Sequence, residues 1–337
     1  MDFYEYLKNL TSLRQKQLRT AIFVNLVERA EDLTTFSKYE RGMIEKETNL
    51  VPFTTKSEQV SKDGSTKWAL VLVDGCVIET VLLQFRDGRN TVCVSSQVGC
   101  ASGCVFCATG QIGFKRNLTA WEIVSQVLFV SRKLKAKGGK LTNVVFMGMG
   151  EPLFNLQNVL FAIGELNNPD YFNLGRRHIT VSTCGPIKPL LQFIESDTGT
   201  TLAISLHAAD QKLREKLMPI AKVNPLSELM HVLDQFVSKT NKKVTYEYLM
   251  LKGENDSIDH AYKLAELLKG RLALVNLISF NEIPGSGFRA SSRNQIERFK
   301  TVLLENRIPV TLRVSLGEEI AGACGQLAGR QELGSKN

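Results

Sequence analysis

From Thr91 onward, the chain alternates between apolar strand patterns and amphipathic helix patterns. Consecutive strand–helix–strand units join parallel strands by right-handed crossovers, so strict alternation favours one parallel sheet with helices packed on it. The expected strands cover 91–95, 143–147, 178–182, 201–205, 244–250, 274–278 and 310–313. The expected helices cover 119–136, 156–166, 186–195, 210–217, 226–239, 257–269 and 291–306. We therefore predict an α/β fold whose parallel sheet closes wholly or partly into a barrel.

Two segments with different patterns precede the alternating region. Residues 1–52 place apolar side chains at helical spacing, which predicts a small helical domain. Residues 53–90 contain two strand-like runs around Asp74-Gly75, a dipeptide that is a strong hairpin signal between apolar runs. We predict an N-terminal helical accessory domain over 1–52, a β-hairpin linker over 53–90, the barrel over 91–330 and a tail over 331–337.

The charge of the chain is compatible with a polyanionic partner such as RNA. The net charge is +8. RNA contact by the N-terminal domain is one interpretation of its basic residues, and an ordinary solvated helix face is the other. The basic residues gather in two groups, which are Lys8, Arg14, Lys16 and Arg19, and then Lys115, Arg116, Arg132, Lys133, Lys135, Lys137 and Lys140.

The sequence indicates a protein that neither crosses a membrane nor is secreted. No apolar run approaches the roughly 18–20 residues of a membrane span. The start, Met1–Glu5, lacks the basic and then apolar layout of a secretory signal. An odd total of seven cysteines also disfavours a secreted disulfide framework. We expect a cytoplasmic protein with reduced thiols.

Three of the cysteines lie within eight residues, at Cys100, Cys104 and Cys107. Such a cluster indicates a metal site, but it has one thiolate too few for a closed structural zinc site or an ordinary ferredoxin cluster. Three thiolates on a four-iron cluster would leave one iron open to a substrate or cofactor. A zinc site completed by a distant ligand and a coincidence of buried cysteines are the alternatives.

Polar residues and glycines follow several of the expected strands. In a parallel barrel the loops after the strands form the active face, and the cysteine cluster itself follows the first strand. Glycines allow a ligand to approach the backbone closely, and Glu151 offers an acceptor for an ammonium group. Each residue alone could simply cap the next helix. Together they predict a ligand pocket facing the cysteines, formed by Gly148, Gly150, Glu151, Ser182, Thr183, Ser205, Leu206, His207 and Asn281.

Four further cysteines and one acid stand apart from the cluster. Cys93 and Cys324 read as small buried hydrophobic residues, although Gly322 and Gly325 suggest an exposed loop that carries Cys324 to the site. Cys76 and Cys184 are expected to be structural. Glu79 lies inside a strand pattern, and the local alternation predicts that its side chain faces solvent.

Five strings in order resemble one known family. The spacing of Cys100, Cys104 and Cys107 is the radical S-adenosylmethionine (SAM) signature. The wider strings are similar to the RlmN/Cfr family of RNA adenosine methyltransferases, and the resemblance covers about residues 14–330. The strings are Cys93-Val-Ser-Ser-Gln-Val-Gly-Cys100, Phe106-Cys-Ala-Thr-Gly110, Met147-Gly-Met-Gly-Glu-Pro152, Ser205-Leu-His207 and Ala323-Cys-Gly-Gln-Leu327.

The resemblance implies a chemistry for each of these residues. Cys100, Cys104 and Cys107 would hold one [4Fe-4S] cluster, whose open iron binds a SAM molecule that is cleaved to a 5′-deoxyadenosyl radical. Another SAM would methylate Cys324, and the radical would convert that S-methyl group to a methylene radical that adds to the base. Cys93 would then resolve the protein–RNA adduct through a disulfide with Cys324. Glu79 matches the proton acceptor, and the SAM-contacting positions match Gly150, Glu151, Ser182, Ser205, Leu206, His207 and Asn281.

The same resemblance implies partners and leaves alternatives open. The partial barrel of radical SAM enzymes, 23S rRNA and tRNA substrates, an electron donor such as flavodoxin and a monomeric state are expected. Strings such as Ser95-Ser-Gln-Val-Gly99 look more like the enzymes that methylate adenine C2 than those that methylate C8 and confer antibiotic resistance. A non-catalytic iron–sulfur protein that binds RNA is the alternative from another class, although binding alone needs no pair of thiols such as Cys93 and Cys324.

Overall fold

The computed structural model describes residues 1–283, 285–313 and 315–328. Ten strands form one sheet in the order β1-β2-β3-β4-β7-β8-β9-β10-β11-β12. The pairs from β1 to β4 are antiparallel, and the pairs from β4 to β12 are parallel. The strands span Phe53–Val60 (β1), Thr66–Leu72 (β2), Val77–Gln84 (β3), Asn90–Cys93 (β4), Asn143–Phe146 (β7), Ile179–Thr183 (β8), Thr201–Ser205 (β9), Val244–Met250 (β10), Ala273–Ser279 (β11) and Val310–Arg313 (β12).

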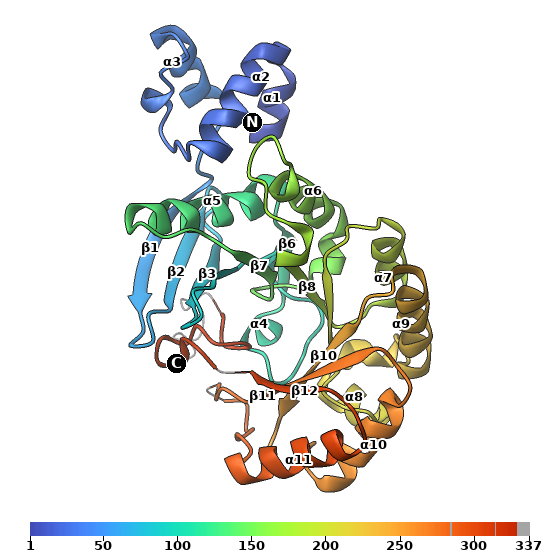
Figure 1. The fold of residues 1–337 in the computed structure, drawn as a ribbon. Coiled ribbons are helices and arrows are strands. Elements are labelled where there is room, and N and C mark those ends of the chain that lie inside the picture. Colours follow the sequence, from blue (N-terminus) through green and yellow to red (C-terminus); the bar gives the residue numbers. More distant parts are fainter. Residues whose placement is uncertain (284, 314, 329–337) are drawn as a thin grey trace.

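The sheet curves into a barrel that stays open. Across the described ranges, β1 and β12 each pair along one edge only. Figure 1 shows the long helices around the outside of the parallel strands and the short helix α4 inside the curve. The predicted partial parallel barrel is therefore confirmed. The helices of this region span Ala108–Gln111 (α4), Ala120–Ala136 (α5), Leu156–Asn167 (α6), Ile187–Glu195 (α7), Gln211–Leu217 (α8), Leu226–Thr240 (α9), Ile258–Leu268 (α10) and Arg293–Glu305 (α11).

All the strands and helices predicted after Thr91 are present, with ends shifted by at most two residues. The predicted hairpin is β2 and β3, but β1 was not predicted. Seven of its eight residues are exposed, so it lacks the alternation that marks a half-buried strand. A second small sheet was also missed, because its strands β5 (Gln97–Gly99) and β6 (Phe114–Asn117) are too short to show a pattern. The whole predicted tail over 331–337 and residues 329–330 of the barrel lie outside the described residues.

The N-terminal segment folds into short helices that pack directly on the barrel. They are α1 (Phe3–Lys8), α2 (Ser12–Arg19), a π-helical turn (Thr20–Val24) and α3 (Lys38–Glu47). Phe3 stacks on Trp121 of α5 with 4.0 Å between ring centroids. The indole nitrogen of Trp121 donates to the carbonyl of Asn49 (2.8 Å), so a core aromatic residue of the barrel helix also anchors this domain.

Several of the basic residues that were candidates for RNA contact bind other parts of the chain. Arg19 pairs with Glu165 of α6 and its guanidinium lies over the ring of Tyr171. Arg132 of α5 donates to the carbonyls of Leu26 and Val27, at 2.8 and 2.9 Å. These arginines join the helical domain to the barrel, which narrows the set of basic residues that could contact RNA.

Among the described residues, no helix has both the length and the apolar character needed to cross a bilayer. The long helix α5 has 17 residues. It carries Arg132 and Lys133 near its end, and charged side chains are costly within a bilayer.

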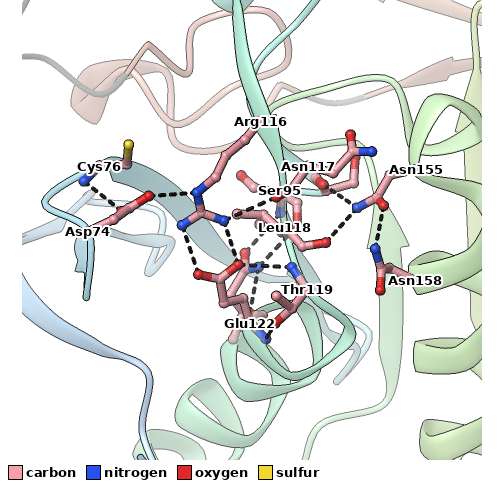
Figure 2. A network of polar contacts seen from close by, with 12 residues as sticks. Asp74, Cys76, Ser95, Arg116, Asn117, Leu118, Thr119, Glu122, Asn155 and Asn158 are labelled. Carbon is pink, nitrogen blue, oxygen red and sulfur yellow. Dashed lines mark hydrogen bonds and ion pairs between the residues drawn. The ribbon is translucent and has the colours of Figure 1, made fainter. Parts of the chain in front are cut away.

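A polar network ties the hairpin to the segment that follows the cysteine cluster (Figure 2). Arg116 on β6 binds the turn residue Asp74 at 2.6 Å and forms two bonds to Glu122 at 2.8 and 2.9 Å. Glu122 also completes the capping box with Thr119 at the start of α5. One arginine therefore joins the β2–β3 turn, β6 and the first turn of α5.

Replacing Arg116 with methionine should lower the free energy of unfolding by about 1–2 kcal/mol, because the variant loses charge-assisted bonds to two carboxylates. Hydrogen bonding from Arg116 lowers the pKa of Asp74 from 3.8 to about 2. The contribution of Asp74 is therefore fully present above pH 3.8 and disappears as the pH falls through about 2. Urea denaturation at a series of pH values measures both effects.

Arg89→Met is the matched control for Arg116→Met. Arg89 pairs with Asp87 within one exposed turn, where both side chains are more than half exposed. We expect a change below about 1 kcal/mol in that variant. Equal losses in the two variants would show that the network around Arg116 adds no stability beyond an ordinary surface pair.

Candidate active site

The ends of the parallel strands and the cysteine cluster open into one cavity with an empty volume of about 830 Å³. The carboxyl ends of parallel strands meet at one edge of a sheet, so residues far apart in sequence converge there. The predicted site residues that line the cavity are Cys100, Cys104, Cys107, Gly150, Glu151, Ser182, Ser205, His207 and Cys324.

The three clustered cysteines lie on a loop held at its base by β5 and β6. The amide of Cys100 donates to the carbonyl of Gly113 (2.9 Å). Gly99 has a φ of +76°, and a Cβ there would lie 1.8 Å from the oxygen of Gly113, so only glycine fits. Burial raises the pKa of all three thiols, that of Cys100 to about 11. Thiolates become favourable in such a site beside a metal cation.

The arrangement of the thiols fits a cluster of several irons. No three Cys, His, Asp or Glu side chains in the described ranges are grouped so that they could hold one metal ion. The three thiols instead line a shared cavity, and a multi-iron cluster takes each cysteine thiolate on a different iron. The donor set of three thiols and an adjacent open space therefore suits an iron–sulfur cluster with one iron left open.

Glu151 faces the cavity with its carboxylate already bound by the protein. It accepts hydrogen bonds from the hydroxyl of Thr183 (2.6 Å), the amide of Cys184 (2.8 Å) and the amide of Leu153 (3.0 Å). Burial raises its pKa despite these donors. The bonds hold the carboxylate in one orientation at the cavity wall.

Packing within the chain requires glycine at two positions near Glu151. The sequence analysis explained these glycines by the close approach of a ligand. A Cβ at Gly148 would lie 2.6 Å from the oxygen of Val94. At Gly150, where φ is +99°, a Cβ would lie 2.5 Å from the side chain of Gln97. Both contacts join the loop after β7 to the segment leading to the cysteines, so the two parts of the cavity wall are held together.

His207 is neutral and held in one tautomer. Its Nδ1 accepts a hydrogen bond from the amide of Leu249 (3.0 Å), so Nε2 carries the proton. Burial and the nearby charge of Arg214 lower its pKa to about 3. The neighbouring Leu206 is fully buried, and its side chain does not line the cavity. Its amide donates to the carbonyl of Glu247 (3.1 Å), which joins the loop after β9 to β10.

Cys93, Cys324 and Asn281 line a second cavity, which shares Cys324 with the first. Cys93 is buried at the end of β4, and Cys324 is partly exposed on a loop. Burial, together with Cys324, raises the pKa of the Cys93 thiol to about 12, although Arg313 acts in the opposite direction. Asn281 donates to the carbonyl of Cys324 (3.4 Å), and its own Oδ1 has no partner among the described residues. The two thiols outside the cluster therefore lie on one cavity.

Sequence analysis missed Arg313 and Glu247, which also line the site. Arg313 lines both cavities, lies 3.9 Å from Glu247, and donates to the sulfur of Met147 (3.3 Å). The charge of a Cys324 thiolate is the main cause that raises the pKa of Arg313. A signal was present, because each is the single charged residue of a mostly apolar strand pattern, but the separation of 66 positions in the sequence hid the pairing.

Glu79 is buried, so the expectation of a solvent-facing side chain is wrong. It is 2% exposed and pairs with the equally buried Lys67 (3.2 Å) on the adjacent strand β2. Its carboxylate also accepts from the amide of Ala328 (2.9 Å), while Lys67 donates to the carbonyl of Ala321 (3.2 Å). The pair therefore binds both ends of the loop that carries Cys324, and Glu79 lines neither cavity.

The same loop is also fastened to the cysteine cluster. The amide of Ala108 donates to the carbonyl of Gly325 (2.8 Å), and the hydroxyl of Thr109 donates to the carbonyl of Leu327 (2.5 Å). The loop predicted from the flanking glycines thus lies between the cluster on one side and the β2–β3 hairpin on the other. Cys184, which was expected to be purely structural, lines the first cavity next to Ser102.

Comparison with known proteins identifies the family to which this chain belongs. The profile of the radical SAM superfamily matches residues 94–265. The "Dual-specificity RNA methyltransferase RlmN" of Alkalilimnicola ehrlichii is 42% identical over 301 residues, which are 89% of this chain and 83% of that protein. The chain belongs to the RlmN family of the radical SAM superfamily. The predicted family is thereby confirmed, and membership of the superfamily implies SAM and an iron–sulfur cluster in general.

Two further comparisons support the assignment of this chain to the RlmN family. The "Probable dual-specificity RNA methyltransferase RlmN" of Carboxydothermus hydrogenoformans is 44% identical over 321 residues, with 95% of this chain and 92% of that protein covered. A crystal structure described as a radical SAM methyltransferase from Sphaerobacter thermophilus has a TM-score of 0.94 and 39% identity, with 97% of this chain and 96% of that chain covered. The resemblance thus includes most of the N-terminal helical domain as well as the barrel.

Proposed function

We propose that this chain methylates C2 of an adenosine in 23S rRNA and in certain tRNAs. The observation that carries the proposal is that Cys93 and Cys324 share one cavity, which adjoins the cavity of the cysteine cluster. Binding RNA alone would need no such pair of thiols. The names of the relatives, which describe dual-specificity RNA methyltransferases, support an RNA substrate, and a net charge of +8 is compatible with it.

We assign one [4Fe-4S] cluster to Cys100, Cys104 and Cys107, with the open iron facing the cavity that they line. When bound, the cluster and SAM supply a carbon-centred radical able to act on an S-methyl group. The unpaired Oδ1 of Asn281 could accept a donor of the ligand. Leu206 is fully buried, and its amide and carbonyl both form hydrogen bonds within the chain. The proposed SAM-contacting residues are Gly150, Glu151, Ser182, Ser205, Leu206, His207 and Asn281.

The thiols of the chain carry the methyl group and then release it, with two SAM used per turnover. The sulfur of Cys324 loses its proton and accepts a methyl group from SAM. That carbon is joined to adenine C2, and the C2 hydrogen leaves as a proton while one electron returns to the one-electron carrier that began the turnover. The Cys93 thiolate then attacks the sulfur of Cys324. The sulfur–carbon bond breaks, its electron pair stays on carbon, and a proton completes the new methyl group. A dithiol then reduces the resulting disulfide by two electrons.

The resemblance assigns proton acceptance to Glu79, and this role stays a prediction. The bonds from Lys67 and from the amide of Ala328 support a positioning role as well, because they hold the ends of the Cys324 loop. We further propose a one-electron donor such as flavodoxin, a monomeric state and a cytoplasmic location.

Peptide mass spectrometry should find one S-methyl group on Cys324 after purified protein is incubated with SAM and a reductant. The partly exposed loop makes this thiol the accessible acceptor at the cavity. The peptide containing Cys76 serves as a control, because that partly exposed thiol lines neither cavity. Methylation of Cys76 as well would indicate non-specific alkylation, and an unmodified Cys324 with an intact cluster would favour a non-catalytic RNA-binding protein.

Nucleoside mass spectrometry of rRNA and tRNA from cells with and without this chain tests the position of the methyl group. We expect 2-methyladenosine to disappear when the chain is absent. Loss of 8-methyladenosine instead would assign the chain to the C8 enzymes. Loss from rRNA but not from tRNA would restrict the substrates to rRNA.

A further inference from the structure

Arg214 of α8 is a fully buried cation with no carboxylate partner among the described residues. Its side chain is 0% exposed, and within that part of the chain its one side-chain hydrogen bond runs from Nη2 to the carbonyl of Cys184 (2.7 Å). Nε and Nη1 have no hydrogen-bond partner within the described ranges. Buried polar groups are almost always paired, and an unpaired buried charge is strongly destabilising. The guanidinium therefore requires an anion.

The groups around Arg214 indicate where that anion lies. The acidic groups that favour its charged form are the thiols of Cys184 and Cys104, while burial opposes it. No carboxylate is among the groups that stabilise Arg214 in the described part of the chain. Cys184, whose carbonyl accepts from Arg214, lines the same cavity as Cys100, Cys104 and Cys107. The guanidinium thus lies on the cluster side of α8.

The helix α8 packs directly against the cysteine loop. The amide of Val105 donates to the carbonyl of Leu217, the last residue of α8 (3.1 Å). Leu217 and Met218 belong to the same buried apolar cluster as Phe106 and Cys184. These contacts fix the distance between Arg214 and the loop, so the guanidinium cannot turn to solvent.

We propose that Arg214 is a positioning residue that compensates the negative charge of the iron–sulfur cluster and raises its reduction potential. The inference rests on the proposed function, because it requires Cys100, Cys104 and Cys107 to hold the cluster. A cluster with three thiolate ligands is negatively charged, and it gains one further negative charge when a one-electron donor reduces it. A buried cation stabilises the reduced form more than the oxidised form, and hydrogen bonds to cluster sulfur act in the same direction.

The test compares anaerobically reconstituted wild-type protein with Arg214→Met, a neutral side chain that fits an apolar site. Reduction by dithionite, followed by electron paramagnetic resonance during a potential titration, gives the midpoint potential of the cluster. We expect the equilibrium for reduction to become about 10- to 100-fold less favourable, each tenfold change being about 59 mV for one electron. In thermal unfolding without metal, Arg214→Met should be at least as stable as the wild-type protein. Without a cluster, the buried and unpaired guanidinium of the wild type lowers the free energy of unfolding.

Arg132→Met is the matched control, because the side chain of Arg132 is only 11% exposed and also donates to backbone carbonyls, but it joins α5 to the N-terminal domain. The midpoint potential of the cluster in Arg132→Met should equal that in the wild-type protein. Arg214→Lys, which keeps the charge, should restore most of the potential, and Arg214→Gln should behave like Arg214→Met. If both neutral variants fail to hold iron while Arg214→Lys holds it, charge compensation is also supported.

The outcomes separate this inference from the proposed function. A wild-type chain that takes up no iron and sulfide overturns both. A wild-type chain that holds a cluster, together with an unchanged potential in Arg214→Met, overturns the role of Arg214 alone. An equal shift in Arg132→Met would also overturn it, because the effect would then follow from the loss of any buried arginine.

Discussion

Replacing Cys93 with alanine is expected to stop the reaction after one turnover, with RNA covalently attached to Cys324. In the proposed mechanism the thiolate of Cys93 attacks the sulfur of Cys324 and releases the methylated base. Among the residues lining their shared cavity, Cys93 and Cys324 are the only cysteines of the described chain. No other thiol lies there to take over, so we expect steady-state turnover to fall by about 10³-fold or more.

A denaturing gel of labelled RNA, followed by mass spectrometry of the RNase-treated adduct, measures this result. The adduct should approach one RNA per chain and map to Cys324. Cys76→Ala is the matched thiol control and should turn over normally, since Cys76 lines neither cavity. The double variant Cys93→Ala/Cys324→Ala should form no adduct. Normal turnover by Cys93→Ala would remove Cys93 from the mechanism.

Replacing Lys67 with methionine should destabilise the protein by about 3–5 kcal/mol, because it leaves the carboxylate of Glu79 buried without its cation. Both side chains of this pair are at most 3% exposed, so water cannot compensate. The variant also loses the bond from Lys67 to the carbonyl of Ala321, which holds one end of the Cys324 loop. Urea denaturation measures the loss, and faster alkylation of Cys324 by iodoacetamide would report release of the loop.

Two controls separate the buried charge from the loss of contacts. In Lys67→Met/Glu79→Leu both charges are absent, so most of the stability should return. Lys133→Met removes a partly exposed pair with Glu58 (3.3 Å) and should cost less than about 1 kcal/mol. If the double variant is as unstable as Lys67→Met, the unpaired charge is not the cause. If the double variant is stable but inactive, Glu79 acts in the reaction beyond its pairing with Lys67.

Much of the fold could be read from local patterns. Each of the strands and helices after Thr91 buries one face or one stripe, so its hydrophobic period is visible in the sequence. The cysteine loop was equally visible, because Cys100, Cys104 and Cys107 are close together in the chain. The strand β1 was missed for the opposite reason, since almost all of its residues are exposed and its pairing with β2 depends on backbone hydrogen bonds.

The convergence of the site could also be predicted, since parallel strands place their carboxyl ends at one edge. This argument predicts that Glu151, Ser182, Ser205 and His207 lie at one cavity, and all four line it. It failed for the charged residues inside strands. Nothing local shows that Lys67 pairs with Glu79 or that Glu247 faces Arg313, because the partners lie on different strands.

By itself, the sequence determined the partial barrel, the cysteine loop and the family, because these depend on periodicity and on short strings of neighbouring residues. The tertiary structure alone decided how charge is distributed around the site. It buried Glu79 against Lys67, placed Arg313 on the cavity that Cys93 and Cys324 line, and left two donors of Arg214 unpaired among the described residues. A charge is stabilised or not by groups a few ångströms away, and folding alone determines which groups those are.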